Sequence, residues 1–164
     1  MSGTVRPIGP DDVAAVVGLV RELADYEKAL SEVRLTGEQL TATLFGSSPA
    51  LFGHVAVADD GAVVGMALWF LNFSTWRGTH GIYLEDLYVQ PAHRGTGLGR
   101  ELLRTLAETC VQHGYSRLEW AVLDWNTPSI EFYKAAGAVP MDEWTVFRLT
   151  DDALTDFAEP RSHR

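Results

Sequence analysis

The stretch Val89-Gln-Pro-Ala-His-Arg94-Gly95-Thr96-Gly97-Leu98-Gly99-Arg100 decides the fold of the middle of this chain. The apolar run before it, 81–89, predicts a strand, and the pattern after it, 98–113, predicts a helix. Three glycines on alternate positions between a strand and a helix let backbone N–H groups face an anion. The unpaired N–H groups and partial positive charge of a helix N-terminus favour the same ligand. The stretch therefore predicts a phosphate or pyrophosphate site.

Three kinds of glycine-rich loop compete for this assignment. A nucleoside-triphosphate loop needs Lys and then Ser or Thr after its last glycine, but Arg100 and Glu101 follow Gly99. A dinucleotide loop needs a third glycine where Arg100 stands. The spacing Arg94-x-x-Gly97-x-Gly99 instead resembles the coenzyme A pyrophosphate loop of the GCN5-related N-acetyltransferase (GNAT) superfamily. A plain flexible turn is the remaining alternative.

A second motif follows in Asp124-Trp-Asn126-Thr-Pro-Ser129-Ile-Glu-Phe-Tyr133-Lys-Ala-Ala-Gly137-Ala138. Asn126 is a good N-cap and Gly137 a natural helix stop, so a short capped helix is expected between them. The same spacing also resembles the GNAT segment that flanks the thioester. Because two independent motifs occur in family order, the chain is identified as a member of the superfamily.

Within the superfamily, the chain most resembles the diamine (spermidine/spermine) and thialysine acetyltransferases. That resemblance rests on segments 22–28, 83–86 and 124–134 and on Trp76. It implies an α/β GNAT fold, a mixed, twisted β-sheet with helices on both faces. It also implies a single N-acetyltransferase domain over 1–158, followed by a tail, 159–164, that we expect to be flexible.

The periodicity of apolar residues agrees with this architecture. Strands are predicted at 4–8, 51–58, 62–73, 80–89, 117–123 and 144–149. Helices are predicted at 10–29, 36–45, 98–113 and 127–136. Local signals support these bounds, since Thr36-x-x-Gln39 is a capping-box pattern and Asp59-Asp60-Gly61 is a tight turn between strands.

The resemblance implies acetyl-CoA as the acetyl donor, held by the strand end, the loop and the second motif. The implied donor contacts are Leu87, Tyr88, Val89, Arg94, Gly95, Thr96, Gly97, Leu98, Gly99, Arg100, Asn126, Ser129 and Tyr133. The pantetheine arm carries amides, so it can pair like an added strand along Leu87, Tyr88 and Val89. A backbone N–H at Leu87 or Tyr88 can polarise the thioester carbonyl.

Transfer of the acetyl group also needs an acid for the sulfur and a base for the amine. The resemblance puts the hydroxyl of Tyr133 beside the sulfur, and a phenol with a pKa of about 10 can donate to a departing thiolate. Glu85 is the favoured base, directly or through water, because a carboxylate within an apolar strand is costly without a role. Asp86 is the alternative. Adjacent strand residues face opposite ways, so both can enter one cleft only where the strand is irregular.

The acceptor end departs from the resemblance at one position. Ser74 stands two residues before Trp76, where polyamine acetylases carry an acidic residue. The implied acceptor contacts are Tyr26, Glu27, Trp76, Glu85, Asp86, Asp142 and Trp144. With one carboxylate fewer, we expect direct transfer to a primary amine of a small molecule. A diamine or a thialysine-like amino acid fits at least as well as spermidine.

Composition narrows the choice of partner and compartment. The net charge of −9 argues against nucleic acid and fits either a cationic substrate or ordinary solubility. No apolar stretch reaches the length of a membrane span, and the single cysteine, Cys110, cannot form an intrachain disulfide, so we expect a cytoplasmic protein. No spacing of His, Cys and Asp indicates a metal site.

Relatives of this kind pair, and the apolar strand predicted at 144–149 would be an unprotected edge, so we expect a homodimer. Two other functions stay open. One is a non-catalytic domain that binds or senses acyl-CoA, which could dispense with Tyr133 and Glu85, whereas the chain carries both. The other is an acetyltransferase that acts on an antibiotic or on a protein amine.

Overall fold

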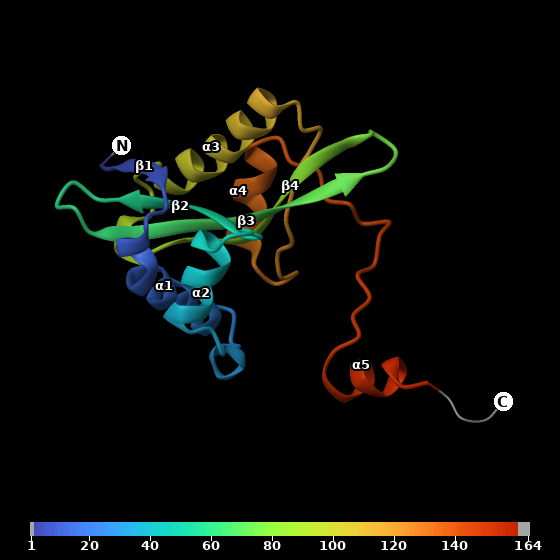
Figure 1. The fold of residues 1–164 in the computed structure, drawn as a ribbon. Helices are drawn as coiled ribbons and strands as arrows, with labels where there is room; N and C mark the ends of the chain where they lie inside the picture. Colours follow the sequence, from blue (N-terminus) through green and yellow to red (C-terminus); the bar gives the residue numbers. More distant parts are fainter. Residues whose placement is uncertain (1, 161–164) are drawn as a thin grey trace. The chain divides into compact units, whose positions relative to one another are not determined.

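The computed structural model describes residues 2–160 (Figure 1). The chain divides into two compact units, Met1–Leu123 and Asp124–Arg164, and each is described by itself. Most of the predicted flexible tail, 159–164, lies outside the described residues.

The first unit is built on a five-stranded sheet with the order β1-β2-β3-β4-β5. Its strands are β1 (Thr4–Pro7), β2 (Phe52–Val57), β3 (Val63–Ser74), β4 (Thr79–Val89) and β5 (Leu118–Glu119). Neighbouring strands are antiparallel except β4 and β5, which are parallel, so the sheet is mixed, as predicted. The predicted strand 117–123 is shorter than expected, because its pairing stops at Tyr83, just before an irregularity in β4.

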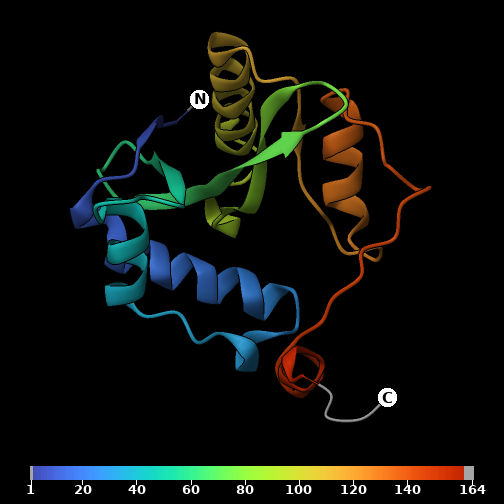
Figure 2. The ribbon, with the colours of Figure 1, turned by 45° about the vertical axis from the view of Figure 1, so that its right-hand side comes forward.

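Helices cover both faces of this sheet, which confirms the predicted architecture (Figures 1 and 2). Helices α1 (Val13–Tyr26) and α2 (Gly37–Phe45) lie on one face, and α3 (Leu98–His113) lies on the other. Alternate residues of β3, Met66 and Leu68, enter the core with α1 and α2. On α3, Leu98, Leu102 and Leu106 are buried at helical spacing, so one stripe of that helix packs inward.

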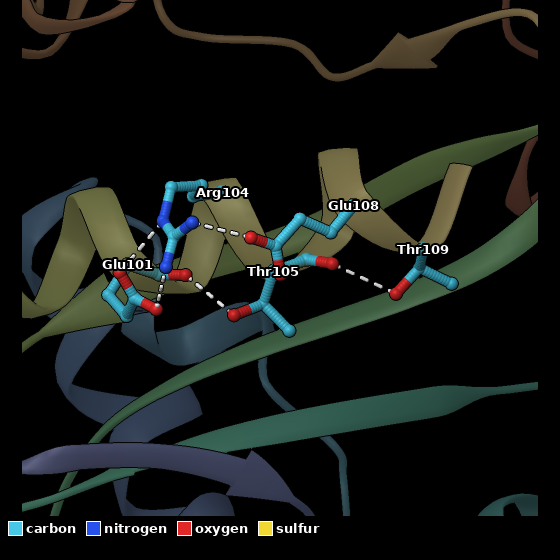
Figure 3. A network of polar contacts seen from close by, with 5 residues as sticks. All are labelled: Glu101, Arg104, Thr105, Glu108 and Thr109. Atoms are coloured by element: carbon cyan, nitrogen blue, oxygen red, sulfur yellow. Dashed lines mark hydrogen bonds and ion pairs between the residues drawn. The ribbon is translucent and has the colours of Figure 1, made fainter. Parts of the chain in front are cut away.

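Polar side chains of α3 bond to one another and to the helix backbone (Figure 3). Arg104 bridges Glu101 and Glu108, which lie three residues before it and four residues after it. Thr105 and Thr109 donate their hydroxyls to the carbonyls of Glu101 and Thr105, at 2.8 and 2.9 Å. These i,i+3 and i,i+4 contacts favour a continuous helix directly behind the glycine loop.

The local signals in the sequence proved accurate. Gln39 N donates to Thr36 Oγ1 and Thr36 N donates to Gln39 Oε1, both at 3.1 Å, so the capping box begins α2. The turn between β2 and β3 places Gly61 at φ +88°, a conformation that glycine adopts readily.

The second unit contains α4 (Thr127–Ala135) and α5 (Asp151–Ala158), joined by irregular chain (Figure 1). Asn126 Oδ1 accepts a bond from Ser129 N at 3.4 Å, so the predicted N-cap is confirmed. The strand predicted at 144–149 is wrong, since these residues belong to no strand and Val146 and Phe147 are 83% and 92% exposed. Apolar residues form a strand only where another strand supplies hydrogen bonds, and none does so among the described residues of this unit, 124–160.

Candidate active site

Strand β4 is irregular at the two predicted acidic residues. Leu84 pairs with Trp69 and Asp86 pairs with the next residue, Leu68, so Glu85 is the extra residue of a β-bulge. A bulge interrupts the alternation of side chains between the two faces of a strand, so Glu85 and Asp86 need not face opposite sides. The irregularity that the sequence argument required is therefore present at this point.

Three carboxylates interact electrostatically at the bulge, those of Glu27, Glu85 and Asp86. Burial, together with the smaller effects of the negative charges of Glu85 and Glu27, raises the pKa of Asp86 from 3.8 to about 6. Burial also raises the pKa of Glu27, which follows the last residue of α1. Glu85 itself is exposed. The cluster suits a cationic group, because a positive charge placed there would offset the mutual repulsion of the carboxylates.

Beyond the bulge, β4 presents an edge that β5 does not cover. Within the described residues, β5 pairs with Ile82 and Tyr83 alone. Gln90 N donates to Val64 O at 2.9 Å, which sets the alternation of bonds between β3 and β4. By that alternation, Tyr88 bonds toward β3, while the backbone groups of Leu87 and Val89 point toward the open edge. An extended arm that carries amides can therefore pair with this edge at Leu87.

The glycine loop takes the shape expected of an anion site. Gly95 and Gly97 lie at φ +77° and +91°, in the left-handed region, and Gly97 is the N-cap of α3. No side chain caps the first turn of α3, so its N–H groups face outward from the helix end. A Cβ added at Gly95 would meet nothing within 4 Å, so space is open beside the backbone there. The hydroxyl of Thr96 donates to His93 O at 2.6 Å, within the same loop.

Arg94 lies in a position that the sequence argument did not anticipate. Its Nε donates to Val89 O at 3.0 Å. Its guanidinium carbon is 5.5 Å from the ring centroid of Tyr26 and 5.6 Å from that of Tyr88. Arg94 thus contacts two predicted donor residues and one predicted acceptor residue at once, although it is exposed, as is Arg100 in the first turn of α3.

The sequence analysis did not predict two further residues of this site, Glu22 and Gln90. Glu22, on α1, accepts bonds from the hydroxyl of Tyr88 and from Nε2 of Gln90, at 3.1 Å each. Glu22 and Tyr26 are four residues apart on a helix and therefore lie on one face of it. This spacing could have predicted that Glu22 lies beside the predicted site residue Tyr26. The partner strand, 66 residues further along the chain at Tyr88, could not be read from that spacing.

The predicted acceptor residues of the first unit do not all come together. Trp76 lies in the turn between β3 and β4 and is 90% exposed. The strand from Thr79 to Glu85 spans about 20 Å, at about 3.3 Å per residue, so Trp76 is remote from the carboxylates of its own unit. Ser74 is buried, and its Oγ accepts a bond from Arg77 N at 3.1 Å, so this serine closes the turn.

The remaining predicted residues belong to the second unit. Asn126 is buried, Ser129 and Tyr133 are half-buried on α4, and Asp142 and Trp144 lie in the irregular segment that follows. The ring centroids of Tyr133 and Phe132 are 5.5 Å apart. Their roles toward donor and acceptor stay predictions.

Two negative observations apply to residues 2–160. No group of three or more His, Cys, Asp or Glu side chains in that range is arranged to hold a metal ion. None of the helices described there has both the length and the apolar content needed to cross a bilayer.

Comparisons with known proteins agree with this geometry. A family model described as "Acetyltransferase (GNAT) family" matches residues 19–138. Thialysine N-epsilon-acetyltransferase of Bos taurus is 38% identical over 166 residues, which cover 94% of this chain and 96% of that protein. Spermidine/spermine N(1)-acetyltransferase-like protein 1 of Homo sapiens is 29% identical over 94% of this chain and 23% of its own length. A solved integron cassette protein from the mobile metagenome of V. cholerae has a TM-score of 0.80 and 26% identity, covering 98% of this chain and 99% of that chain.

Proposed function

Because the chain belongs to the GNAT family of acetyltransferases, we propose that it transfers the acetyl group of acetyl-CoA directly to a primary amine of a small molecule. The acceptor class is a diamine, a polyamine or a thialysine-like amino acid. The observation that carries this proposal is the cluster of Glu27, Glu85 and Asp86 beside the open edge of β4. A small ammonium compound is the ligand that such a cluster attracts.

The residues of the first unit fit the donor. The N–H groups of the glycine loop and of the first turn of α3 are proposed to hold the pyrophosphate, with Arg100 nearby. The open edge at Leu87 and Val89 is proposed to pair with the pantetheine arm. By the family resemblance, Asn126, Ser129 and Tyr133 complete the donor contacts.

Direct transfer assigns each proton a destination. The amine nitrogen bonds to the thioester carbonyl carbon while the carbon–sulfur bond breaks. An ammonium acceptor loses two protons: a carboxylate takes one, and the other replaces the proton that Tyr133 gives to the sulfur. Glu85 is the more accessible carboxylate. Asp86, with its pKa raised to about 6, is better matched to accept a proton near neutral pH, so both remain candidate bases.

A panel of amines tests the proposal. Thiol release from saturating acetyl-CoA is followed with thialysine, lysine, short diamines, spermidine, spermine and aminoglycosides. We expect turnover with a small primary amine and no better turnover with spermidine, because Ser74 replaces the acid of the polyamine acetylases. Spermidine or spermine turnover far above that of all other amines contradicts the assignment. Binding of acetyl-CoA without turnover of any amine supports the sensor alternative.

We also propose one catalytic domain over residues 1–158 that works as a homodimer. The family model runs across the boundary between the two units, which supports a single domain. The second unit leaves large apolar side chains exposed, as an interface would use. They include Met141, Trp144, Val146, Phe147, Leu149, Leu154 and Phe157.

A cytoplasmic location is proposed with this function. Cys110 is a buried free thiol and the chain has no second cysteine to pair with it, as suits a reducing compartment. Cell fractionation with an antibody against the chain tests the location.

A further inference from the structure

The last two turns of α1 are tied to the end of β4 by contacts that the proposed reaction does not use. Tyr88 and Gln90 donate to Glu22 at 3.1 Å each. One helical turn further on, Tyr26 lies against the guanidinium of Arg94, 5.5 Å from ring centroid to carbon. The same face of α1 therefore contacts β4 and the start of the glycine loop.

Arg94 uses its side chain in three directions. Its Nε donates to Val89 O, and its guanidinium lies over the rings of both Tyr26 and Tyr88. A planar guanidinium can stack on rings and donate from its edge, whereas a lysine ammonium cannot do both. The position of the Arg94 side chain is therefore set by contacts within the protein.

We propose that Arg94 is a positioning residue that fixes the acceptor end of α1 against the donor strand β4. The inference rests on the proposed function and concerns the same site. Tyr26 is followed by Glu27, whose charge acts on Asp86. By holding Tyr26 at one end and the Val89 carbonyl at the other, Arg94 sets the spacing between the carboxylates and the open edge. Acetyl transfer depends on that spacing, because reacting groups must meet in a near-attack geometry.

Three variants separate positioning from phosphate binding. Arg94→Met removes the charge and the stacking, Arg94→Lys keeps the charge alone, and Arg100→Met is the matched control in the same loop. The dissociation constant of acetyl-CoA is measured by calorimetry, and KM and kcat are measured with the best amine of the panel. We expect Arg94→Met to raise the KM of the amine about tenfold, the combined size of two such ring contacts. Its acetyl-CoA dissociation constant should change no more than that of Arg100→Met.

Arg94→Lys should not restore the KM of the amine, because it lacks the planar fork. Full restoration by Lys overturns the inference, and so does an Arg94→Met variant with weakened acetyl-CoA binding and an unchanged amine KM. Should Arg94→Met fail to fold, Arg94→Lys decides the matter alone.

A readout without turnover distinguishes failure of the inference from failure of the proposed function. Amide hydrogen exchange of the free protein should be faster in 22–28 for Arg94→Met than for Arg100→Met. Equal exchange in the two variants overturns the positioning role even if the parent acetylates amines. If exchange is faster in Arg94→Met but the parent acetylates no amine, the positioning role of Arg94 is supported and the proposed reaction is rejected.

Discussion

At the scale of single residues, Asp86 links stability to pH. The pKa of Asp86 is 3.8 in the unfolded chain and about 6 in the folded chain. Between pH 3.8 and about 6, the folded chain therefore binds this proton more strongly than the unfolded chain does. The stability that this group contributes is complete below pH 3.8 and is lost as the pH rises through about 6. Asp86→Asn should therefore increase the free energy of unfolding at pH 7.5 by at most about 3 kcal/mol, the equivalent of moving the pKa from 3.8 to about 6, and so raise the melting temperature. The gain should fade toward pH 4, and a lower melting temperature at pH 7.5 contradicts the environment described here. Exposed Glu85→Gln is the control.

The two candidate bases differ in their expected pH profiles. If Asp86 takes the amine proton, kcat/KM for the amine falls below about pH 6, where Asp86 becomes protonated. Glu85→Gln should then keep this acidic limb, and Asp86→Asn should lose it together with most of the activity. Activity that survives Asp86→Asn but not Glu85→Gln assigns the base to Glu85. Both profiles are measured with saturating acetyl-CoA.

Tyr133 gives a third residue-scale prediction, which separates chemistry from packing. Tyr133→Phe removes one oxygen and keeps the ring. We expect a melting temperature and an acetyl-CoA affinity near those of the parent, with turnover lower by roughly 10²-fold, within the range of general-acid help. Rapid quenching of a single turnover shows whether the chemical step is slowed. An unchanged rate would make Tyr133 structural.

At the scale of elements, the glycine loop and α3 show what a local sequence can specify. The bounds of α3 and the capping box of α2 agree with prediction, because glycines, caps and helical spacing act over a few residues. The bulge at Glu85 depends on the register of β3, and the contact of Arg94 with Tyr26 joins distant segments. Neither is encoded locally. The incorrect prediction of a strand at 144–149 has the same cause. A strand needs a second strand to bond with, and the local pattern of apolar residues does not identify one.

The loop itself is tested by paired glycine variants. Gly97 lies at φ +91°, so Gly97→Val strains the backbone and should reduce both the melting temperature and acetyl-CoA affinity. Gly97→Asn tolerates the left-handed conformation, so it should keep the melting temperature while its side chain obstructs the helix end and weakens binding. Gly99→Ala is the control for stability, because its Cβ would meet only Val89 Cγ2 at 3.7 Å. Parent-like acetyl-CoA affinity in both Gly97 variants would show that the pyrophosphate binds elsewhere.

At the scale of the whole molecule, the second unit exposes many large apolar side chains close together in the sequence. Trp144, Val146 and Phe147 are 69%, 83% and 92% exposed, and Leu154 and Phe157 of α5 are 50% and 76% exposed. A stretch of this kind on a chain with net charge −9 is better explained by a partner surface than by contact with water. A second copy is the partner that we propose, and the prediction is a dimer mass in light scattering at micromolar concentration.

A single substitution tests whether the exposed apolar segment forms the interface of the proposed dimer. Phe147→Asp places a charge in the middle of the segment, so it should shift the mass toward the monomer and lower the melting temperature. Val111→Asp is the matched control, because Val111 is also exposed, at 81%, but lies on α3 of the first unit. The melting temperature of the parent should rise with protein concentration, since association stabilises the folded state by mass action, and that of Phe147→Asp should not. A monomeric parent, or a Phe147→Asp variant that stays dimeric, would remove this segment from the interface.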